Sequence, residues 1–334
     1  MLIRFFLGLI LLTALFYFVG LAELIQVFAE IRLDFVLYLF LLAGVMIWAS
    51  CLKWRLFIRA SGTDVPLLHL MRLYTIGYFF NTFLPSYVGG DIARSYHLGQ
   101  YIKSQRDALV ATFLERFTGL LAMALLGVIF VLIGSEITSG LGFAIFSVAI
   151  IALLVAACFF SEKFGYFSFQ IVRSLIGIFE RRAFIEKVKK LVDVFEQSIK
   201  YAREDKVLLL RALYLSFLFH LLTVVNTYLA ARAIGWSDPS VSGLFVVVPL
   251  VLLVSMAPVT PSGLGIQEGA FLYLLTRIGA SQSQGLGVGL VLRAKVMVLA
   301  VIGGLLWLSL KNGQSITKLK STVSAVKVEA HDLR

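Results

Sequence analysis

Residues 285–310 read GLGVGLVLRAKVMVLAVIGGLLWLSL, and this stretch decides the fold class. It is long enough to cross a bilayer as one helix, which needs about 20 mostly apolar residues. Comparable apolar segments lie at 5–22, 35–52, 108–134, 141–160 and 207–231. We therefore predict an all-α polytopic membrane protein with about six full spans.

The composition of the 334 residues agrees with this class. Hydrophobic residues make up 60% and charged residues 15% of the chain, whereas soluble domains are roughly 45–50% apolar and about 25% charged. The continuous apolar runs are also unlike the alternating strands of an outer-membrane barrel. The first run is longer than the apolar core of a signal peptide and lacks an A-x-A cleavage site, so we expect a retained first helix.

The excess of basic residues sets the expected orientation. Lys and Arg outnumber Asp and Glu by 30 to 19, a net charge of +11. With both termini in the cytoplasm, 24 of the 30 basic residues fall on the cytoplasmic side, Lys53 and Arg94 among them. Only Arg116, Arg293 and Lys295 fall within the bilayer. The positive-inside rule thus predicts a multi-pass protein of the cell (inner) membrane, with no nucleic-acid partner.

Three further apolar segments, at 73–88, 243–258 and 266–276, are too short to be plain spans. Proline lacks a backbone donor and glycine adopts conformations closed to other residues, so both interrupt helices. The interruptions contain Pro85, Gly89, Gly90, Pro258, Pro261, Gly263 and Gly265. We therefore predict two broken, re-entrant helical elements.

The two breaks resemble each other in sequence. PSYVGGDIARSY from Pro85 resembles PSGLGIQEGAFLY from Pro261, and Asp91 matches Glu268 at a spacing of 177. Arg116 matches Arg293 at the same spacing. Because the predicted orientation makes the spans after each break cross in opposite directions, we expect an inverted 4+4 repeat, as in many secondary transporters. The repeat forms one domain over 1–310, with halves at about 1–134 and 141–310.

Two regions outside the spans are polar. Segment 161–206 places apolar residues at helical spacing opposite Lys and Arg. It predicts a cytoplasmic amphipathic helix that lies on the inner leaflet or packs on the base of the protein. Residues 311–334 form a cytoplasmic tail. Cys51 and Cys158 sit in apolar segments without a Cys/His cluster, so we expect no disulfide framework, metal site or cofactor.

The chemistry-bearing residues gather at the two breaks and in the spans that follow them. A helix start attracts anions, and Asp91 is expected to cap the helix that begins beside it. Arg116 and Arg293 lie near the bilayer middle, where a charge must face an interior or a water-filled space. The candidate substrate-binding residues are Asn81, Gly89, Gly90, Asp91, Arg94, Glu115, Arg116, Thr260, Gly263, Gly265, Glu268, Arg293 and Lys295.

Structural roles remain open for the same residues. In one alternative the first break is a kinked helix that emerges at the cytoplasmic surface, with Asp91 and Arg94 solvated. In another, Arg116 pairs with Glu115, Asp91 or Glu268 and only braces the bundle. Two polar residues of the span 207–231, His220 and Asn226, are expected to bond to a neighbouring helix.

These motifs together resemble the flippase-like transmembrane family typified by the membrane domain of lysylphosphatidylglycerol synthases. The resemblance rests on an N-x-x-x-P-x-x-x-G-G-D-x-x-R block from Asn81 to Arg94, on Glu115-Arg116, and on a T-P-x-G-x-G-x-x-E block from Thr260 to Glu268. It spans about residues 5–310. It implies a helical membrane domain that moves lipids across the bilayer, aminoacylated phosphatidylglycerol in the best-known members. This sequence lacks the soluble aminoacyl-transferase domain fused to some relatives, so the cargo stays open.

The sequence therefore predicts a lipid flippase, not an enzyme, whose partners are anionic lipids or lipid-linked phosphates. No nucleotide-binding loop or hydrolase motif is present in the sequence. Two alternatives remain open. One is an integral-membrane transferase with Asp91 or Glu268 as base, and the other is a non-transporting scaffold for a separate lipid-modifying enzyme.

Overall fold

The computed structural model describes residues 2–83, 89–133, 205–256 and 259–332, together with six single positions between 150 and 196. Every regular element in these parts of the chain is a helix. The first half contains α1 (Leu2–Val19), α2 (Leu21–Ala29), α3 (Leu33–Ala60), α4 (Leu67–Phe83), α5 (Gly89–Tyr101) and α6 (Gln105–Ile133). The second contains α10 (Lys206–Ala233), α11 (Val241–Ser255), the 3₁₀ turn η1 (Pro261–Gly263), α12 (Ile266–Thr276) and α13 (Gln282–Asp332).

Three of the described helices are long and apolar enough to cross a membrane: Leu33–Ala60, Lys206–Ala233 and Gln282–Leu310. A fourth candidate is the pair Phe5–Val19 and Leu21–Ala29, which bends by 85° at Gly20. The all-helical, multi-pass class is thus confirmed, with three or four span candidates. The predicted span 108–134 is covered by α6, whereas 141–160 lies outside the described residues except for Ile150.

The helices break where the sequence predicts. The structure describes α4 as far as Phe83 and α5 from Gly89, on either side of the first predicted break. In the second half, Ser262, Gly263 and Gly265 all have positive φ, of 50°, 65° and 78°. This left-handed backbone cannot continue a right-handed helix, so η1 separates α11 from α12. Pro85, Pro258 and the predicted amphipathic segment 161–206 lie outside the described residues, apart from single positions. The expected tail is helical as far as Asp332.

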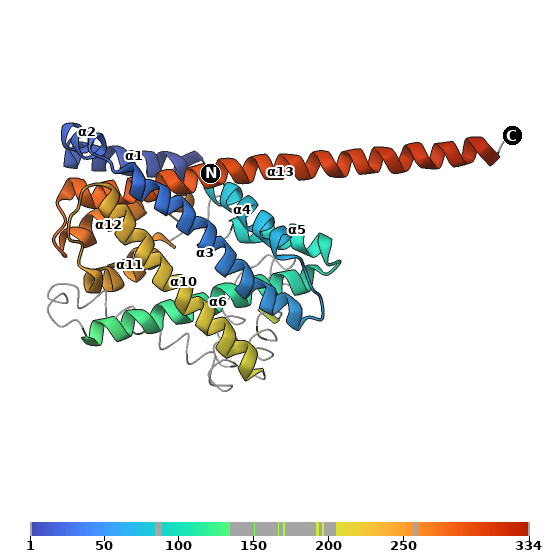
Figure 1. Cartoon of the computed structure of the whole chain (residues 1–334), viewed down its shortest axis with the longest axis horizontal. Helices are drawn as coiled ribbons and strands as arrows, with labels where there is room; N and C mark the ends of the chain where they lie inside the picture. The colour runs from blue at the N-terminus through green and yellow to red at the C-terminus, as the bar shows by residue number, and fades with distance from the viewer. Residues whose placement is uncertain are drawn as a thin grey trace.

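Two antiparallel helices, α3 and α10, form the centre of the bundle (Figure 1). The amide of Arg32, just before α3, donates to the carbonyl of Ala233 at the end of α10 over 2.8 Å. Two buried cores lie beside this pair, and each includes residues from both halves of the chain. One core surrounds Trp54 and Leu70, and the other surrounds Val247 and Leu275. Across the halves, α13 packs against α4 and α6 packs against α11.

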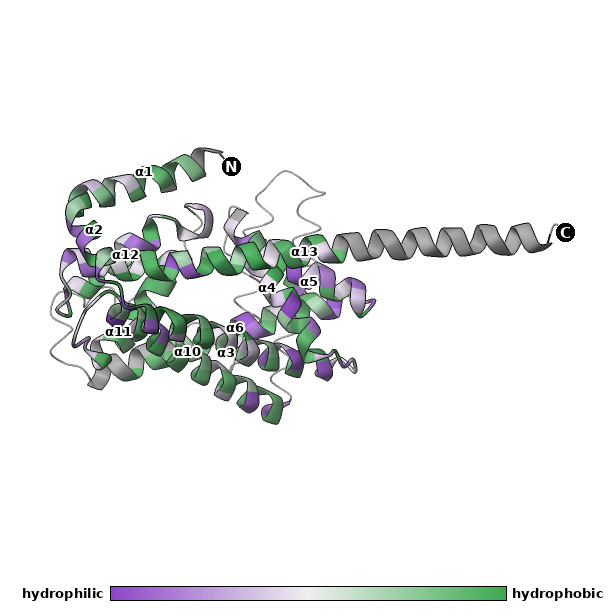
Figure 2. Cartoon of the chain, turned by 45° about the horizontal axis from the view of Figure 1, so that its top comes forward, coloured by the Kyte–Doolittle hydropathy of each residue, from purple (hydrophilic) through white to green (hydrophobic). Residues whose placement is uncertain are grey.

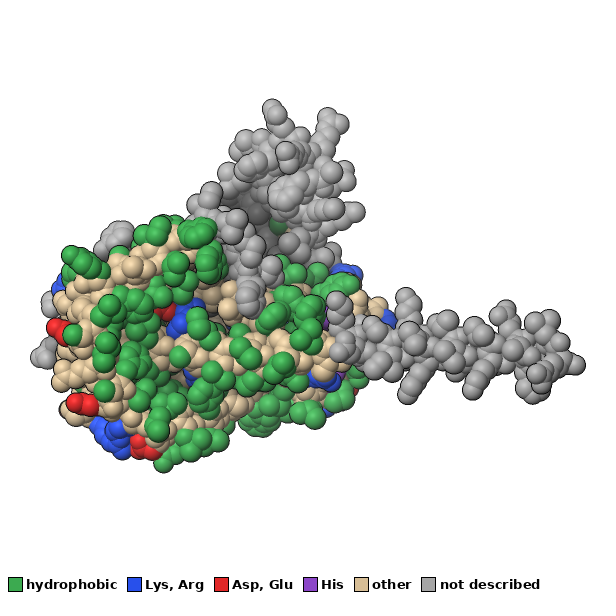
Figure 3. Space-filling model, turned by 90° about the horizontal axis from the view of Figure 1, so that it is seen from above, with side chains coloured by type: hydrophobic (Ala, Val, Ile, Leu, Met, Phe, Trp, Pro, Cys, Tyr) green, Lys and Arg blue, Asp and Glu red, His purple; other side chains and the backbone are tan. Residues whose placement is uncertain are grey.

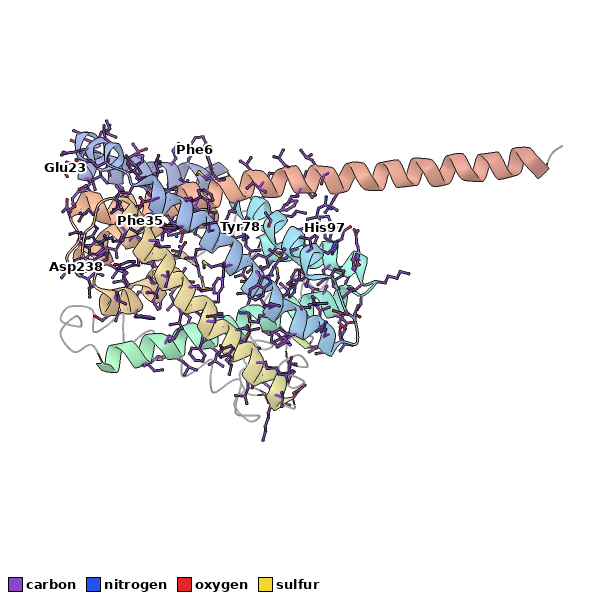
Figure 4. The ribbon with its side chains drawn as sticks, viewed as in Figure 1. Phe6, Glu23, Phe35, Tyr78, His97 and Asp238 are labelled. Carbon is purple, nitrogen blue, oxygen red and sulfur yellow. The ribbon has the colours of Figure 1, made fainter. Side chains whose placement is uncertain are left out.

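The surface is that of a protein in lipid. Long apolar stretches follow α1, α3, α10 and α13 (Figure 2). Seen from above, the molecule is covered mainly by hydrophobic side chains, most visible acidic groups lie at one end, and a few basic groups lie within the apolar face (Figure 3). Glu23 and Asp238 lie at one end of the bundle, opposite His97 (Figure 4). Apolar surface between polar ends is typical of a membrane interaction.

Candidate functional site

The first break is held together by an asparagine and two glycines. Asn81, near the end of α4, accepts a 2.7 Å hydrogen bond from the amide of Gly90 through its Oδ1 atom. A Cβ atom at Gly90 would lie 2.1 Å from the carbonyl oxygen of Gly77, so only glycine fits there. The expected cap was Asp91. Instead Asn81 binds the free amide at the start of α5, and Asp91 lies in the first turn with its carboxylate directed to α6.

Five charged side chains form a chain of alternating sign, which we call the first cluster. Arg116 binds both oxygens of Asp91, with its Nε and Nη2 atoms at 2.8 Å. Arg94 Nε lies 2.9 Å from Asp91 Oδ1, and Arg94 Nη2 donates to Glu115. Lys53 Nζ lies 3.7 Å from Glu115 Oε1. Each carboxylate is therefore shared by two cations.

The two arginines of this cluster have different environments. Arg94 is 1% exposed, and its guanidinium lies over the rings of Trp54 and Tyr74, 4.6 and 4.5 Å from their centroids. The Arg116 side chain is 46% exposed, while its partner Asp91 is only 13% exposed. The alternative in which Arg94 lies solvated at the surface is therefore wrong. Aromatic faces and two carboxylates stabilise its charge inside the protein instead.

The second break carries a second cluster, formed by Glu268, Arg293 and Lys295 with their polar neighbours. Glu268 accepts from the amide of Gly265 over 2.8 Å and pairs with Arg293 Nε at 2.6 Å. Arg293 Nη1 donates to the carbonyl of Ser262 over 2.9 Å. One carboxylate thus fixes both the strained backbone of the break and the arginine. This arginine is 9% exposed, in contrast to Arg116.

The central helix α10 supplies neutral partners to both clusters. Lys53 donates to Ser216 Oγ over 3.0 Å, and Lys295 donates to Asn226 Oδ1. Between these two contacts, His220 Nε2 lies 2.8 Å from the carbonyl oxygen of Gly119. His220 and Asn226 therefore bond to neighbouring helices, as expected from their position in a span.

The structure thus brings the predicted residues together in two groups. Asn81, Gly89 and Gly90 frame the first cluster, and Thr260, Gly263 and Gly265 frame the second. In both groups the carboxylate–arginine pair spans 25 residues, Asp91 to Arg116 and Glu268 to Arg293.

Sequence reasoning missed Lys53 and Ser216. The sequence places Lys53 on the cytoplasmic flank of its span, whereas in the structure it is a buried member of the first cluster. The burial of Lys53 could have been predicted from the apolar residues Trp54, Phe57 and Ile58 that follow it. They continue the buried face of α3 at helical spacing beyond Lys53 and so indicate that the helix stays in the protein interior.

Comparison with known proteins agrees with these motifs. The family model described as the lysylphosphatidylglycerol synthase TM region matches residues 1–304. Two relatives from Methanothermobacter thermautotrophicus (strain Delta H) are each described as a UPF0104 membrane protein. One is 24% identical over 294 residues, 83% of this chain and 85% of the relative. The other is 22% identical over 298 residues, 84% of this chain and 83% of the relative. No solved structure matches the chain significantly. The match over nearly the whole chain shows that this protein belongs to the lysylphosphatidylglycerol synthase transmembrane-region family.

Proposed function

We propose that this protein is a lipid transporter, a flippase that moves a phosphate-bearing lipid between the leaflets of the cell membrane. The observation that carries the proposal is the exposed guanidinium of Arg116, held by Asp91 beside a broken helix. A guanidinium binds phosphate through two parallel hydrogen bonds, in the way that it binds Asp91 here. A phosphate group can therefore compete with the Asp91 carboxylate for the same guanidinium.

We also infer an inverted repeat, which favours transport over a purely structural role. Adding 177 to the first residues of α3, α4, α5 and α6 gives 210, 244, 266 and 282, and α10 to α13 begin at 206, 241, 266 and 282. The pair α3 and α10 is antiparallel, and α6 and α13 run in opposite directions in Figure 1. We infer six full spans and two broken elements, with both termini in the cytoplasm. Inverted repeats with central broken helices are the plan of many transporters.

The two clusters have complementary roles in this proposal. A charge near the bilayer middle costs about 2.5–3.5 kcal/mol on insertion scales, so Arg116, Arg293 and Lys295 need a reason beyond packing. Asp91 and Glu268 hold the arginines in place when no substrate is bound. The headgroup replaces the carboxylate at one arginine and then at the other, while the acyl chains stay in lipid. The chain's own residues carry out no bond making or breaking.

Purified protein in liposomes tests this function. We expect it to move a fluorescent anionic phospholipid between leaflets without ATP, and we expect Arg116→Ala to abolish this movement. Arg116→Lys should recover only part of it, because lysine lacks the two-pronged geometry. Arg211→Ala, a loss of charge at an exposed position of α10, is the matched control.

Two results would contradict the proposal. In the first, a panel of phosphate-bearing lipids crosses the membrane no faster than in empty liposomes, with and without a proton gradient. This result favours the scaffold alternative. The other is turnover of a labelled donor by the pure protein, which favours the transferase alternative.

A further inference from the structure

Two buried lysines, Lys53 and Lys295, are held in the same way. Their side chains lie on α3 and α13 and are 4% and 8% exposed. Each donates to a neutral oxygen of α10, Lys53 to Ser216 and Lys295 to Asn226. The two acceptors are ten residues apart, about 15 Å along the helix axis at a rise of about 1.5 Å per residue. Of the two lysines, only Lys53 has a carboxylate of the described residues within 4 Å.

The charge balance of the described side chains is the same in both clusters. The first cluster contains three cations and two carboxylates, and the second contains Arg293 and Lys295 against Glu268. Each therefore carries one uncompensated positive charge. A buried charge without a counter-ion is strongly unfavourable, so each cluster attracts one negative charge.

Each region also holds a buried polar atom without a partner. In the first cluster this atom is Arg94 Nη1, on a side chain that is 2% exposed. At the second break it is Thr260 Oγ1, on a residue that is 1% exposed. Buried donors and acceptors are nearly always satisfied in native proteins. The orphaned atoms therefore point to a ligand with oxygen atoms at both places.

From these observations we propose that each cluster takes one singly charged phosphodiester group, and that Lys53 and Lys295 supply the charge that selects it. This inference rests on the proposed function and narrows it from any phosphate-bearing lipid to one charge class. A phosphodiester monoanion neutralises a cluster. A phosphomonoester dianion leaves it negative, and a zwitterionic headgroup adds a cation to a site that is already positive.

The test measures selectivity in liposomes with three fluorescent lipids. These are phosphatidylglycerol, a monoanionic phosphodiester, zwitterionic phosphatidylcholine, and phosphatidic acid, a phosphomonoester. We expect the wild-type protein to move phosphatidylglycerol faster than either of the others, by roughly tenfold or more. In Lys295→Met the preference over phosphatidylcholine should fall by about tenfold, because the neutral side chain keeps the length and removes the charge. Lys53→Met should have the same effect.

Matched variants separate charge from packing. Lys295→Arg keeps the charge and should keep most of the preference, and Lys206→Met removes an exposed charge at the start of α10 and should change nothing. Glu115→Gln raises the first cluster to two net positive charges and should shift transport towards phosphatidic acid. Thermal unfolding in detergent identifies any variant that fails to fold. If a methionine variant fails, Lys295→Arg and Glu115→Gln decide whether the charge of the cluster selects the lipid.

The outcomes distinguish this inference from the function on which it rests. If the wild-type protein moves no phosphate-bearing lipid, the proposed function fails. If it moves all three lipids at similar rates, or if Lys295→Met keeps the wild-type preference, only the charge selection is overturned. Soluble glycerophosphoglycerol and inorganic phosphate form a separate arm. Competition by either at a concentration equal to that of the lipid would assign the clusters to free phosphates and overturn the lipid headgroup as the ligand.

Discussion

At the scale of single residues, burial separates two arginines that the sequence treats alike. Arg94 is enclosed by two aromatic rings and two carboxylates, whereas the guanidinium of Arg116 reaches the surface. Both bind Asp91. In the structure Arg94 Nε and Nη2 therefore brace the two carboxylates while Nη1 has no partner among the described residues, and the exposed guanidinium of Arg116 can be reached by a ligand.

This difference predicts the stability of two variants. Arg94→Ala removes the buried guanidinium that joins Asp91 to Glu115 and leaves Glu115 with Lys53 alone, at 3.7 Å. Loss of one partner of a buried ion pair destabilises by about 3–5 kcal/mol. Arg116→Ala should destabilise much less, because its side chain is 46% exposed and Arg94 still pairs with Asp91 after the change. Chemical unfolding in detergent micelles measures both. Equal stability of the two variants would contradict the assignment.

At the scale of elements, close helix contacts depend on glycine. The long helix α13 lies against α4, and a Cβ atom at Gly303 would be 2.2 Å from the carbonyl oxygen of Thr75. The neighbouring Gly304 faces the ring of Phe79 in the same way. Small residues let membrane helices approach at backbone distance. This contact joins the first half of the chain to the second.

Alanine substitutions test this packing. Gly303→Ala forces α4 and α13 apart and should destabilise the protein by about 1–3 kcal/mol, the usual range for overpacking. Gly44→Ala in α3 is the control, since no atom lies within 4 Å of its added methyl group. Unfolding midpoints in detergent compare the two. A Gly303→Ala variant as stable as Gly44→Ala would show that this contact is loose.

At the scale of the whole molecule, the proposed inverted repeat predicts which loops share a side of the membrane. The turn after α3 contains Ser61, and the corresponding turn after α10 contains Ser237. The start of α3 lies against the end of α10, so the two helices are antiparallel. The turns that follow them therefore lie at opposite ends of the central pair. A parallel repeat would place them on the same side.

Cysteine labelling decides between the two arrangements. In a background with both native cysteines replaced, Ser237→Cys should react with an impermeant maleimide from outside the cell. Ser61→Cys should react only after the membrane is opened. Both residues are exposed in the structure, so failure to react reports the side and not burial. If both cysteine variants are labelled from the same side of the membrane, the inverted repeat is ruled out.

The sequence alone determined the class of protein and the places where its helices break. Apolar runs set by composition predict membrane helices, and the prolines and glycines around Gly89 and Pro261 predict the interruptions. These features depend on local chemistry along the chain, which a sequence states directly. The matching positions of Asp91 with Glu268 and of Arg116 with Arg293 were visible for the same reason.

Only the tertiary structure decided which charges meet and which of them are exposed. Lys53 joins Glu115, and Ser216 and Asn226 each receive a lysine, through contacts between helices far apart in the chain. Such contacts depend on how closely and at what rotation the helices pack. The same packing buries Arg293 and leaves Arg116 exposed, although their local sequences match. Spacing along the chain therefore indicated the pairs of residues, and the packing of helices decided which of them can reach a ligand.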